Sequence, residues 1–592
     1  MKRNLRNILI ATLSLVGTSI PFTTLARPAY PEPMTVTQPD GTRVNITLKG
    51  NWKNKQAFTS DGYLLSYDSN GYYVFADLDA NGNIIPSAIR AYNPEARTTE
   101  INAFLAKINK QEVLDSHTGN LNKKSKSLST RGPGLCEQDN YFPTTGKQKG
   151  LVVLVDFPNC KFSVDNPHDF FFRMLNEEGF SDAESTGSAR DYFVSNSNGL
   201  FQPEFDVYGP ITMSRDYQYY GKNIANGDEP NAPQMFIEAA RAINDDVDFH
   251  DYDRNNDGVI DFIYVFYAGY GEADGGAADT IWPHSWCLRE SMPNAIFSFD
   301  GLRLDNYACS NELSSLADLP EGVGAFVHEF SHVLGLPDDY STITSRAFTP
   351  SYWDVMDIGS YLNNSRTPPN FASHQRYALD WIKPTVMDHE GKYTIHPLQE
   401  TNEAFILVNE DNPNEFYMFE NRQKTGNDKY LPGHGMLVWH IDFVQDVWTD
   451  NSPNNDATHQ HIDLIEADNL RTNSTLADDA FPGGKNITSF TCETLPAFMW
   501  WDVKKFPPHI TNIQETLGKN ITFTVENHND AGIDNIISHT NPIKVEGNTI
   551  SGTGEIFDMY GRKVATLNSS SATLPSGLYI IKTSSATRKI SI

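Results

Sequence analysis

Cysteine is scarce in this chain, and that scarcity limits the kinds of site it can build. The 592 residues include five cysteines, and none of them has the close spacing of a zinc finger. An odd number leaves at least one thiol without a partner inside an exported monomer. Among the five, we expect Cys287 and Cys309 to form a disulfide.

Positive charge is also in short supply, with 46 Lys and Arg against 75 Asp and Glu and a formal net charge of −29. This balance disfavours nucleic acid and anionic membrane surfaces as partners, because both repel a negatively charged protein. It suits a chain that works outside the cell and binds divalent cations. Long apolar runs are missing after the first 26 residues, so we expect no transmembrane anchor.

The first 26 residues are typical of a secretory signal peptide. Lys2, Arg3 and Arg6 form a basic leader, an apolar segment follows from 8 to 20, and residues 24–26 offer a small-residue cleavage site. We therefore expect a secreted protein, located in the extracellular space or at the outer cell surface.

The segment 327–338 contains a His-Glu-x-x-His pattern. His328 and His332 lie a little over one helical turn apart, roughly 6 Å along the axis, so both imidazoles can share one metal ion. Glu329 can then reach a metal-bound water without binding the metal itself. Gly335 and Pro337 predict that the helix ends directly afterwards. Two ordinary histidines on a helix are the alternative interpretation.

A catalytic zinc site needs a third protein ligand. A chain reversal at Gly335 would bring Asp338 or Asp339 towards the two histidines. No glutamate lies between Glu329 and Glu390, which argues against the class of zinc site whose third ligand is a Glu on a later helix. Asp338 is the favoured ligand, and Asp339 is the near alternative.

The extended pattern His-Glu-x-x-His-x-x-Gly-x-x-Asp resembles the metzincin zinc-binding signature, with Asp in place of the usual third His. Residues 334–340, Leu-Gly-Leu-Pro-Asp-Asp-Tyr, resemble the immune inhibitor A family of secreted metallopeptidases. Residues 352–361 resemble the Met-turn of that family, which implies that Met356 packs beneath the metal. The resemblance also implies a metzincin-like catalytic domain and an N-terminal propeptide.

A second set of oxygen donors lies before an expected buried strand. Asp253, Asn255, Asp257 and Asp261 occupy positions one, three, five and nine of a calcium loop, with a glycine at the sharp turn. Position twelve is a tyrosine instead of the bidentate Glu, so the loop is not an EF-hand. We expect structural calcium here, and an Asx-rich turn without an ion is the alternative.

Strand and turn patterns predict a multidomain α+β protein. We expect a signal peptide at 1–26, a β-rich propeptide at 27–131, a metallopeptidase catalytic domain at 132–390, a β-sandwich at 391–528 and a C-terminal sorting domain at 541–592. The propeptide ends in a basic, Ser/Gly-rich linker, and its alternative is a binding module that stays attached. The last segment resembles the sorting domain of type IX secretion, which implies outer-membrane secretion machinery as a partner. A carbohydrate- or surface-binding domain is the alternative there.

These patterns together predict a secreted, calcium-supported zinc endopeptidase that is made as a zymogen and acts on extracellular proteins or peptides. Zinc would activate a water, and Glu329 would act as the general base. Tyr340 and Tyr361 are candidates for holding the oxyanion, and Cys136 could cap the zinc in a latent form, although a structural thiol is favoured. The rivals are a non-catalytic surface adhesin with a vestigial zinc site and a zinc hydrolase of non-peptide amides. Glu329 argues against the adhesin, because a structural metal site needs no base.

Overall fold

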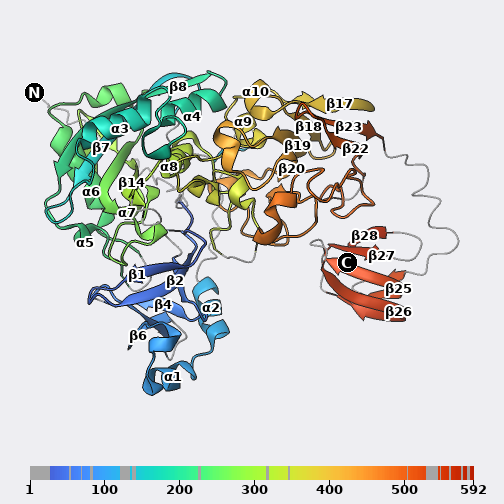
Figure 1. Ribbon diagram of the computed structural model, residues 1–592, viewed down its shortest axis with the longest axis horizontal. Helices are drawn as coiled ribbons and strands as arrows, with labels where there is room; N and C mark the ends of the chain where they lie inside the picture. The colour runs from blue at the N-terminus through green and yellow to red at the C-terminus, as the bar shows by residue number, and fades with distance from the viewer. Residues whose placement is uncertain are drawn as a thin grey trace, which may run out of the picture.

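The computed structural model describes most of the chain from residue 27 to residue 591 (Figure 1). The predicted signal peptide and most of the basic linker lie outside the described residues. The described ranges are 27–51, 55–68, 70–79, 84–119, 134–136, 142–224, 228–314, 319–343, 347–502, 505–527, 544–546, 549–558, 562–574, 578–582 and 587–591.

The first unit is a six-stranded antiparallel meander, drawn in blue at the bottom of Figure 1. In β2, the apolar residues Val44, Ile46 and Leu48 alternate with exposed polar ones, so one face of the sheet is buried. Its elements are β1 (Met34–Thr37), β2 (Arg43–Lys49), β3 (Gln56–Thr59), β4 (Leu64–Tyr67), β5 (Tyr73–Leu78), β6 (Ile84–Arg90), α1 (Thr99–Leu105) and α2 (Lys110–Gly119).

The second unit is built on a largely parallel sheet in the order β11-β14-β10-β7-β8, with β11 antiparallel at the edge. Its central strands are continuous apolar runs because both faces are covered. Val152 and Leu154 of β7 pack with α3, α4 and α8, whereas Leu151 and Val153 pack with α6 on the opposite face. The bounds are β7 (Gly146–Asp156), β8 (Phe201–Thr212), β10 (Ile263–Tyr270), β11 (His284–Cys287), β14 (Asn306–Ser314), α3 (Pro167–Asn176), α4 (Ala189–Asn196), α6 (Ala232–Ile243) and α8 (Gly324–Leu334).

The expected disulfide between Cys287 and Cys309 is wrong, because all five cysteines are free thiols. Both residues lie on the paired strands β11 and β14, but they are not opposite each other. Cys309 faces His284, and Cys287 faces Asn306, so the strand register separates the two thiols by three positions.

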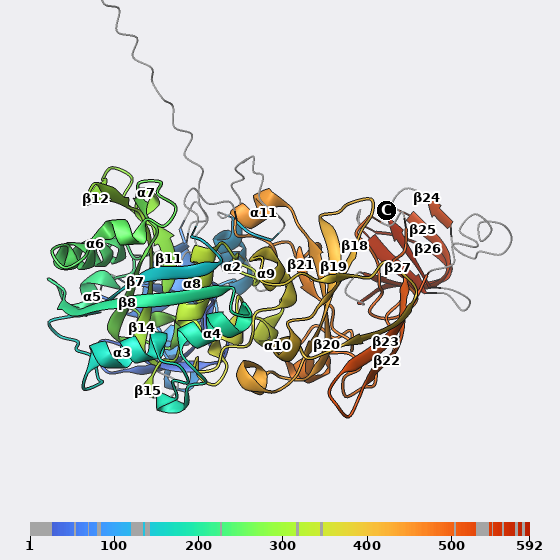
Figure 2. The same ribbon diagram turned by 90° about the horizontal axis from the view of Figure 1, so that it is seen from above.

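Two antiparallel-rich sheets pack on one core in the third unit, as expected of a β-sandwich. The other face of the five-stranded sheet packs on Ala372 and on Trp353, which belongs to the predicted Met-turn. In Figure 2 this unit lies beside the parallel sheet and extends it along the long axis. Its strands are β16 (Thr385–Val386), β18 (Phe405–Val408), β19 (Glu415–Arg422), β20 (Gly435–Asp442) and β21 (Ile462–Leu464) in one sheet, and β17 (Gly391–Ile395), β23 (Ile521–Glu526) and β22 (His509–Glu515) in the other.

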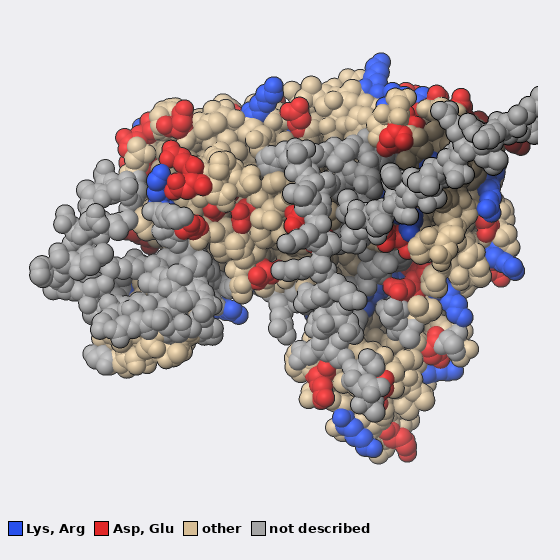
Figure 3. All heavy atoms as spheres, turned by 180° about the vertical axis from the view of Figure 1, so that it is seen from behind, with Lys and Arg blue, Asp and Glu red and all other residues tan. Residues whose placement is uncertain are grey.

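A last, small β-unit follows with a core of its own that includes Ile550, Ile556 and Leu567. Its strands are β24 (Lys544–Glu546), β25 (Thr549–Asp558), β26 (Lys563–Thr573), β27 (Leu578–Lys582) and β28 (Thr587–Ser591). Within the described ranges, no helix has the length and apolarity needed to cross a bilayer. On the described part of the face in Figure 3, acidic and basic side chains are interspersed.

Candidate metal centre and active site

Helix α8 carries the His-Glu-x-x-His pattern through the middle of the second unit. Phe326 and Phe330 lie one turn apart on α8 and stack with ring centroids 5.7 Å apart, which anchors the helix in the core under the sheet. The helix begins at Gly324, where any side chain would collide with the backbone because a Cβ atom would lie 2.1 Å from the Ser360 carbonyl oxygen. It ends at Gly335, which adopts φ 104°, so the predicted C-terminal stop is confirmed.

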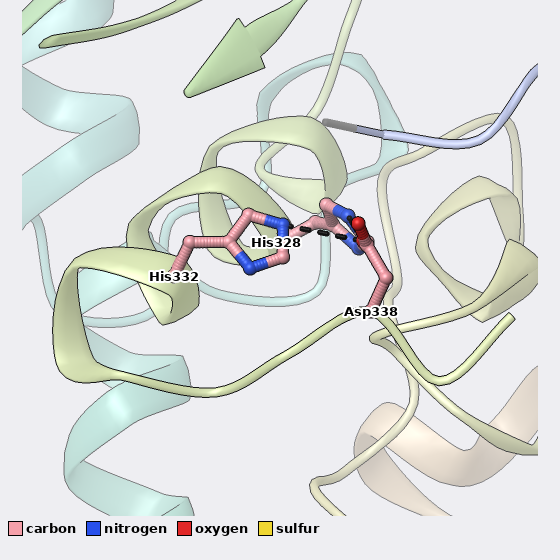
Figure 4. Close-up of side chains that lie close together, drawn as sticks. All are labelled: His328, His332 and Asp338. Carbon is pink, nitrogen blue, oxygen red and sulfur yellow. Dashed lines mark hydrogen bonds and ion pairs between the residues drawn. The ribbon is translucent and has the colours of Figure 1, made fainter. Parts of the chain in front are cut away.

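The chain reversal after Gly335 brings Asp338 against both histidines (Figure 4). Its Oδ1 atom lies 3.2 Å from Nε2 of His328 and 3.3 Å from Nε2 of His332. All three side chains are buried, and their ligand atoms lie within 4.8 Å of one another. Two imidazoles and one carboxylate thus converge on one point.

The hydrogen bonds on the far side of each imidazole leave Nε2 directed at this point. Nδ1 of His328 lies 2.8 Å from the carbonyl oxygen of Val355, and Nδ1 of His332 lies 2.9 Å from that of Leu336. A carbonyl can only accept, so Nδ1 carries the proton and Nε2 presents its lone pair. Burial lowers the pKa of His328, which favours the neutral form that a metal requires.

Charge at the centre also favours a cation. Burial alone would raise the pKa of Asp338, but the two imidazoles outweigh it and hold the pKa at about 2. Burial favours neutral His332, yet the Asp338 carboxylate outweighs this effect and raises the pKa of His332. An ionised carboxylate therefore stands between two imidazoles. The donor set and its outer hydrogen bonds fit a tetrahedral zinc site with one position open.

Asn451 lies between helix α11 (Gln445–Thr449) and β21, and it orients Asp338. Its Nδ2 donates to Oδ2 of Asp338 at 2.6 Å, and its Oδ1 accepts the backbone N–H of Asp338 at 2.7 Å. Oδ1 of Asp338 is thereby turned towards the histidines. The sequence around Asn451 did not predict this role, because the residue lies 113 positions from Asp338 in the chain.

Glu329 is fully buried next to the histidines. Its Oε1 accepts the backbone N–H of Arg27 at 2.6 Å, and its Oε2 makes no hydrogen bond to the described residues. Burial raises the pKa of Glu329 to about 8, although His332 and the Arg27 N–H oppose the shift. A carboxyl group with a raised pKa is suited to take up and return a proton near neutral pH.

Met356 is buried in the core that also contains Phe326, Val327 and Phe330 of α8. Its carbonyl oxygen accepts the N–H of Asp339 at 2.9 Å, which ties the predicted Met-turn to the segment that delivers Asp338. The neighbouring Val355 carbonyl is the acceptor for His328. The turn thus positions two of the expected zinc ligands through its backbone.

Asp339 points away from the two histidines. Gln375 donates from Nε2 to Oδ2 of Asp339 at 2.9 Å and to Oδ1 of Asp354 at 2.7 Å. Nε2 of His374 lies 3.8 Å from Oδ2 of Asp339. The structure therefore separates the two candidate ligands: Asp338 lies at the histidines, and Asp339 lies in a neighbouring buried polar group.

Three of the expected calcium ligands, Asp253, Asn255 and Asp257, lie in the loop between the 3₁₀ turn Phe249–Tyr252 and β9 (Val259–Ile260), and Asp261 follows directly after β9. Asp253 accepts the N–H groups of Asp257 and Gly258, each at 3.0 Å, and Asp257 accepts that of Val259 at 2.8 Å. Asn255 donates from Nδ2 to Oδ2 of Asp257 at 3.0 Å. These are the contacts of the alternative Asx-rich turn.

The fourth expected ligand, Asp261, is buried, and it accepts the Arg254 N–H at 3.0 Å. Burial raises the pKa of Asp261 to about 7, and the nearby Asp253 and Asp257 add to the effect. A cation would stabilise the ionised form of this carboxyl group. Calcium binding in the loop stays a prediction.

The remaining candidates from the sequence are Cys136, Tyr361 and Tyr340. Cys136 donates from its thiol to the Trp448 carbonyl oxygen at 3.1 Å and lies in the core beneath the five-stranded sheet, in keeping with the structural interpretation. Tyr361 donates to the Pro28 carbonyl oxygen at 2.8 Å, so its hydroxyl contacts the N-terminal segment. Tyr340 is buried, and the Asp338 charge adds to the effect of burial in raising its pKa.

Comparison with known proteins gives a family for the second unit. Residues 142–386 match the model of the immune inhibitor A peptidase M6 catalytic domain. The pre-pro-metalloprotease PrtV of Vibrio cholerae serotype O1 is 28% identical over 36% of this chain and 27% of its own length. Immune inhibitor A of Bacillus thuringiensis subsp. alesti is 25% identical over 43% of each chain.

The chain therefore spans less than half the length of the curated relatives it matches. The names of these relatives and the matched model support the expected enzyme class, a metallopeptidase. The resemblance noted in the zinc-binding pattern is thereby confirmed over residues 142–386, which are similar to peptidase M6 catalytic domains of the immune inhibitor A type.

Proposed function

We propose that this protein is a secreted zinc endopeptidase with a metzincin-like catalytic domain, acting on extracellular proteins. The observation that carries the proposal is the convergence of His328, His332 and Asp338 on one point, with Glu329 beside them on the same helix. Three protein ligands and an adjacent carboxylate are what catalytic zinc peptide hydrolysis requires. When bound, zinc would lower the pKa of its water and polarise the scissile carbonyl.

The side chains at the site would then have three roles: holding the metal, orienting its ligands and transferring a proton. His328, His332 and Asp338 hold the metal, while Val355, Leu336 and Asn451 fix their orientation through hydrogen bonds. Glu329 takes a proton from the attacking water and delivers it to the nitrogen of the leaving amine. With the N-terminal segment in place, burial raises the pKa of Glu329 to about 8.

The N-terminal unit, 27–131, is proposed to act as a propeptide that keeps the enzyme latent. Support comes from the segment 27–30, which lies in the active site with the Arg27 N–H on Glu329. Lys55 is held between Glu229 and Glu272, so buried ion pairs also join this unit to the catalytic domain. We expect the secreted active species to begin after the linker near residue 131. N-terminal sequencing of that species checks this, and an active form that still begins at residue 27 would exclude obligatory removal.

Three finer assignments belong to the same proposal. Calcium would stabilise the loop from Asp253 to Asp261. The β-sandwich at 391–528 would support the centre through Asn451. The unit at 541–592 would direct export through outer-membrane secretion machinery.

Metal-dependent cleavage of an unfolded protein tests the proposal. We expect the activated protein to cleave denatured casein, to lose this activity with a chelator and to regain it with stoichiometric zinc. The rival is a surface adhesin that keeps a zinc site without catalysis. Tight zinc binding without detectable cleavage, after the N-terminal unit has been removed, would favour the adhesin.

A further inference from the structure

The Arg27 side chain is sealed inside a pocket next to the candidate active site. The residue has no exposed surface, although it stands at the start of the described chain. Its Nη1 donates to Oε1 of Glu321, and its Nη2 donates to Oγ of Ser365 at 2.5 Å. The guanidinium carbon lies 3.5 Å from the ring centroid of Tyr361. Glu321 and Ser365 thus accept hydrogen bonds from the guanidinium nitrogens, and the Tyr361 ring stacks on the flat face of the cation.

The guanidinium of Arg27 is paired with a buried negative charge in this pocket. Glu321 is buried and forms an ion pair with Arg27. Burial by itself would lower the pKa of Arg27, but the charge of Glu321 is the first of the effects that outweigh it and raise that pKa. An arginine is therefore held here as a cation, out of contact with water.

The backbone of the same segment is held by contacts that any peptide could make. The Arg27 carbonyl oxygen accepts from Nε1 of Trp282 at 3.1 Å. The Pro28 carbonyl oxygen accepts from the Tyr361 hydroxyl at 2.8 Å. The Tyr30 N–H donates to the Ala273 carbonyl oxygen at 3.0 Å. These groups recognise the main chain, so the pocket for the side chain is the selective element.

The register of the segment follows from the catalytic carboxylate. The Arg27 nitrogen donates to Oε1 of Glu329 at 2.6 Å. In the proposed reaction, Glu329 delivers its proton to the nitrogen of the residue that directly follows the scissile bond. The Arg27 nitrogen therefore stands where that leaving amine would be, and residues 28–30 continue along the product side.

We propose that the pocket of Glu321, Ser365 and Tyr361 selects substrates with arginine directly after the scissile bond. Glu321 is the specificity-determining residue, and Tyr361 and Ser365 complete the fit to a guanidinium. This inference rests on the proposed peptidase function. Lysine would fill the pocket less well, because its ammonium group lacks the planar fork that bonds Glu321 and Ser365 while it stacks on Tyr361. A glutamate would be repelled by Glu321.

Sequencing of cleavage products tests the preference. The activated wild-type enzyme and its Glu321→Gln variant digest a denatured protein mixture, and mass spectrometry counts the first residue of each new product. We expect arginine to be enriched at that position by at least about 10²-fold over leucine, since a site built on hydrogen bonds rejects substrates that lack the donors. Glu321→Gln should reduce this enrichment. The control Glu415→Gln, at a buried glutamate that accepts from His440, should preserve it.

A binding measurement in the full chain separates the pocket from the reaction. In Arg27→Ala the pocket is open to a free ligand, and we expect isothermal titration to detect argininamide. The double variant Arg27→Ala/Glu321→Gln should not bind it, provided that its melting temperature shows a folded protein. Products without any arginine enrichment, or equal binding of argininamide and leucinamide, would overturn the proposal. Absence of any cleavage together with selective argininamide binding would refute the peptidase function and leave the pocket established.

Discussion

Lys55→Ala should loosen the N-terminal unit from the catalytic domain. Nζ of Lys55 lies 2.5 Å from Oε1 of Glu229 and 2.6 Å from Oε2 of Glu272. The three side chains are at most 1% exposed, so removal of the lysine leaves two buried carboxylates without their cation. Loss of one partner from a buried ion pair costs about 3–5 kcal/mol. The dissociation constant of the docked unit should therefore rise roughly 150- to 5,000-fold.

The assay follows the N-terminal fragment after the linker has been cut. Dilution of the nicked complex, with size-exclusion chromatography at each concentration, gives the dissociation constant of the fragment. Arg90→Ala is the matched control, because the Arg90–Asp40 pair in the same unit is 43% and 33% exposed. An exposed pair contributes no more than about 1 kcal/mol, so this variant should dissociate nearly as the wild type does. Equal dissociation constants for Lys55→Ala and Arg90→Ala would refute the reasoning.

The metal sites give two further predictions. Asp338→Ala should abolish tight zinc binding, Asn451→Ala should weaken it about 10–100-fold, and Asp339→Ala should retain it. Zinc content after dialysis checks all three variants. Loss of zinc in Asp339→Ala with retention in Asp338→Ala would place the third ligand one residue later. With zinc saturated, calcium should raise the melting temperature of the wild type by mass action and not that of Asp257→Ala, and an equal response of both proteins would show that the loop is not the calcium site.

Local chemistry made the metal centre predictable from the sequence. The four-residue spacing of His328 and His332 places both imidazoles on the same face of a helix, and Gly335 determines where that helix ends. Both features therefore follow from a few adjacent residues. The third donor could be narrowed to Asp338 or Asp339 only. The choice depends on how Asn451 and Gln375 each hold one of the two carboxylates, and both contacts come from distant parts of the chain.

Contacts between distant segments explain what the sequence did not reveal. Arg27 meets Glu329 across 302 residues, and Lys55 meets Glu272 across 217, so no local pattern marks either residue. The disulfide prediction failed for a related reason. Proximity in sequence brought Cys287 and Cys309 onto neighbouring strands, but the strand register, which depends on the packing of the whole sheet, set them three positions apart.

Glu329→Gln tests the central claim most directly, with zinc content and peptide hydrolysis measured in the same activated preparation. Glutamine keeps the size of the side chain and removes its ability to take a proton, while His328, His332 and Asp338 are untouched. We expect zinc at the wild-type stoichiometry and turnover lower by at least about 10²-fold. Near-wild-type turnover with stoichiometric zinc would contradict the assignment of Glu329 as the catalytic base.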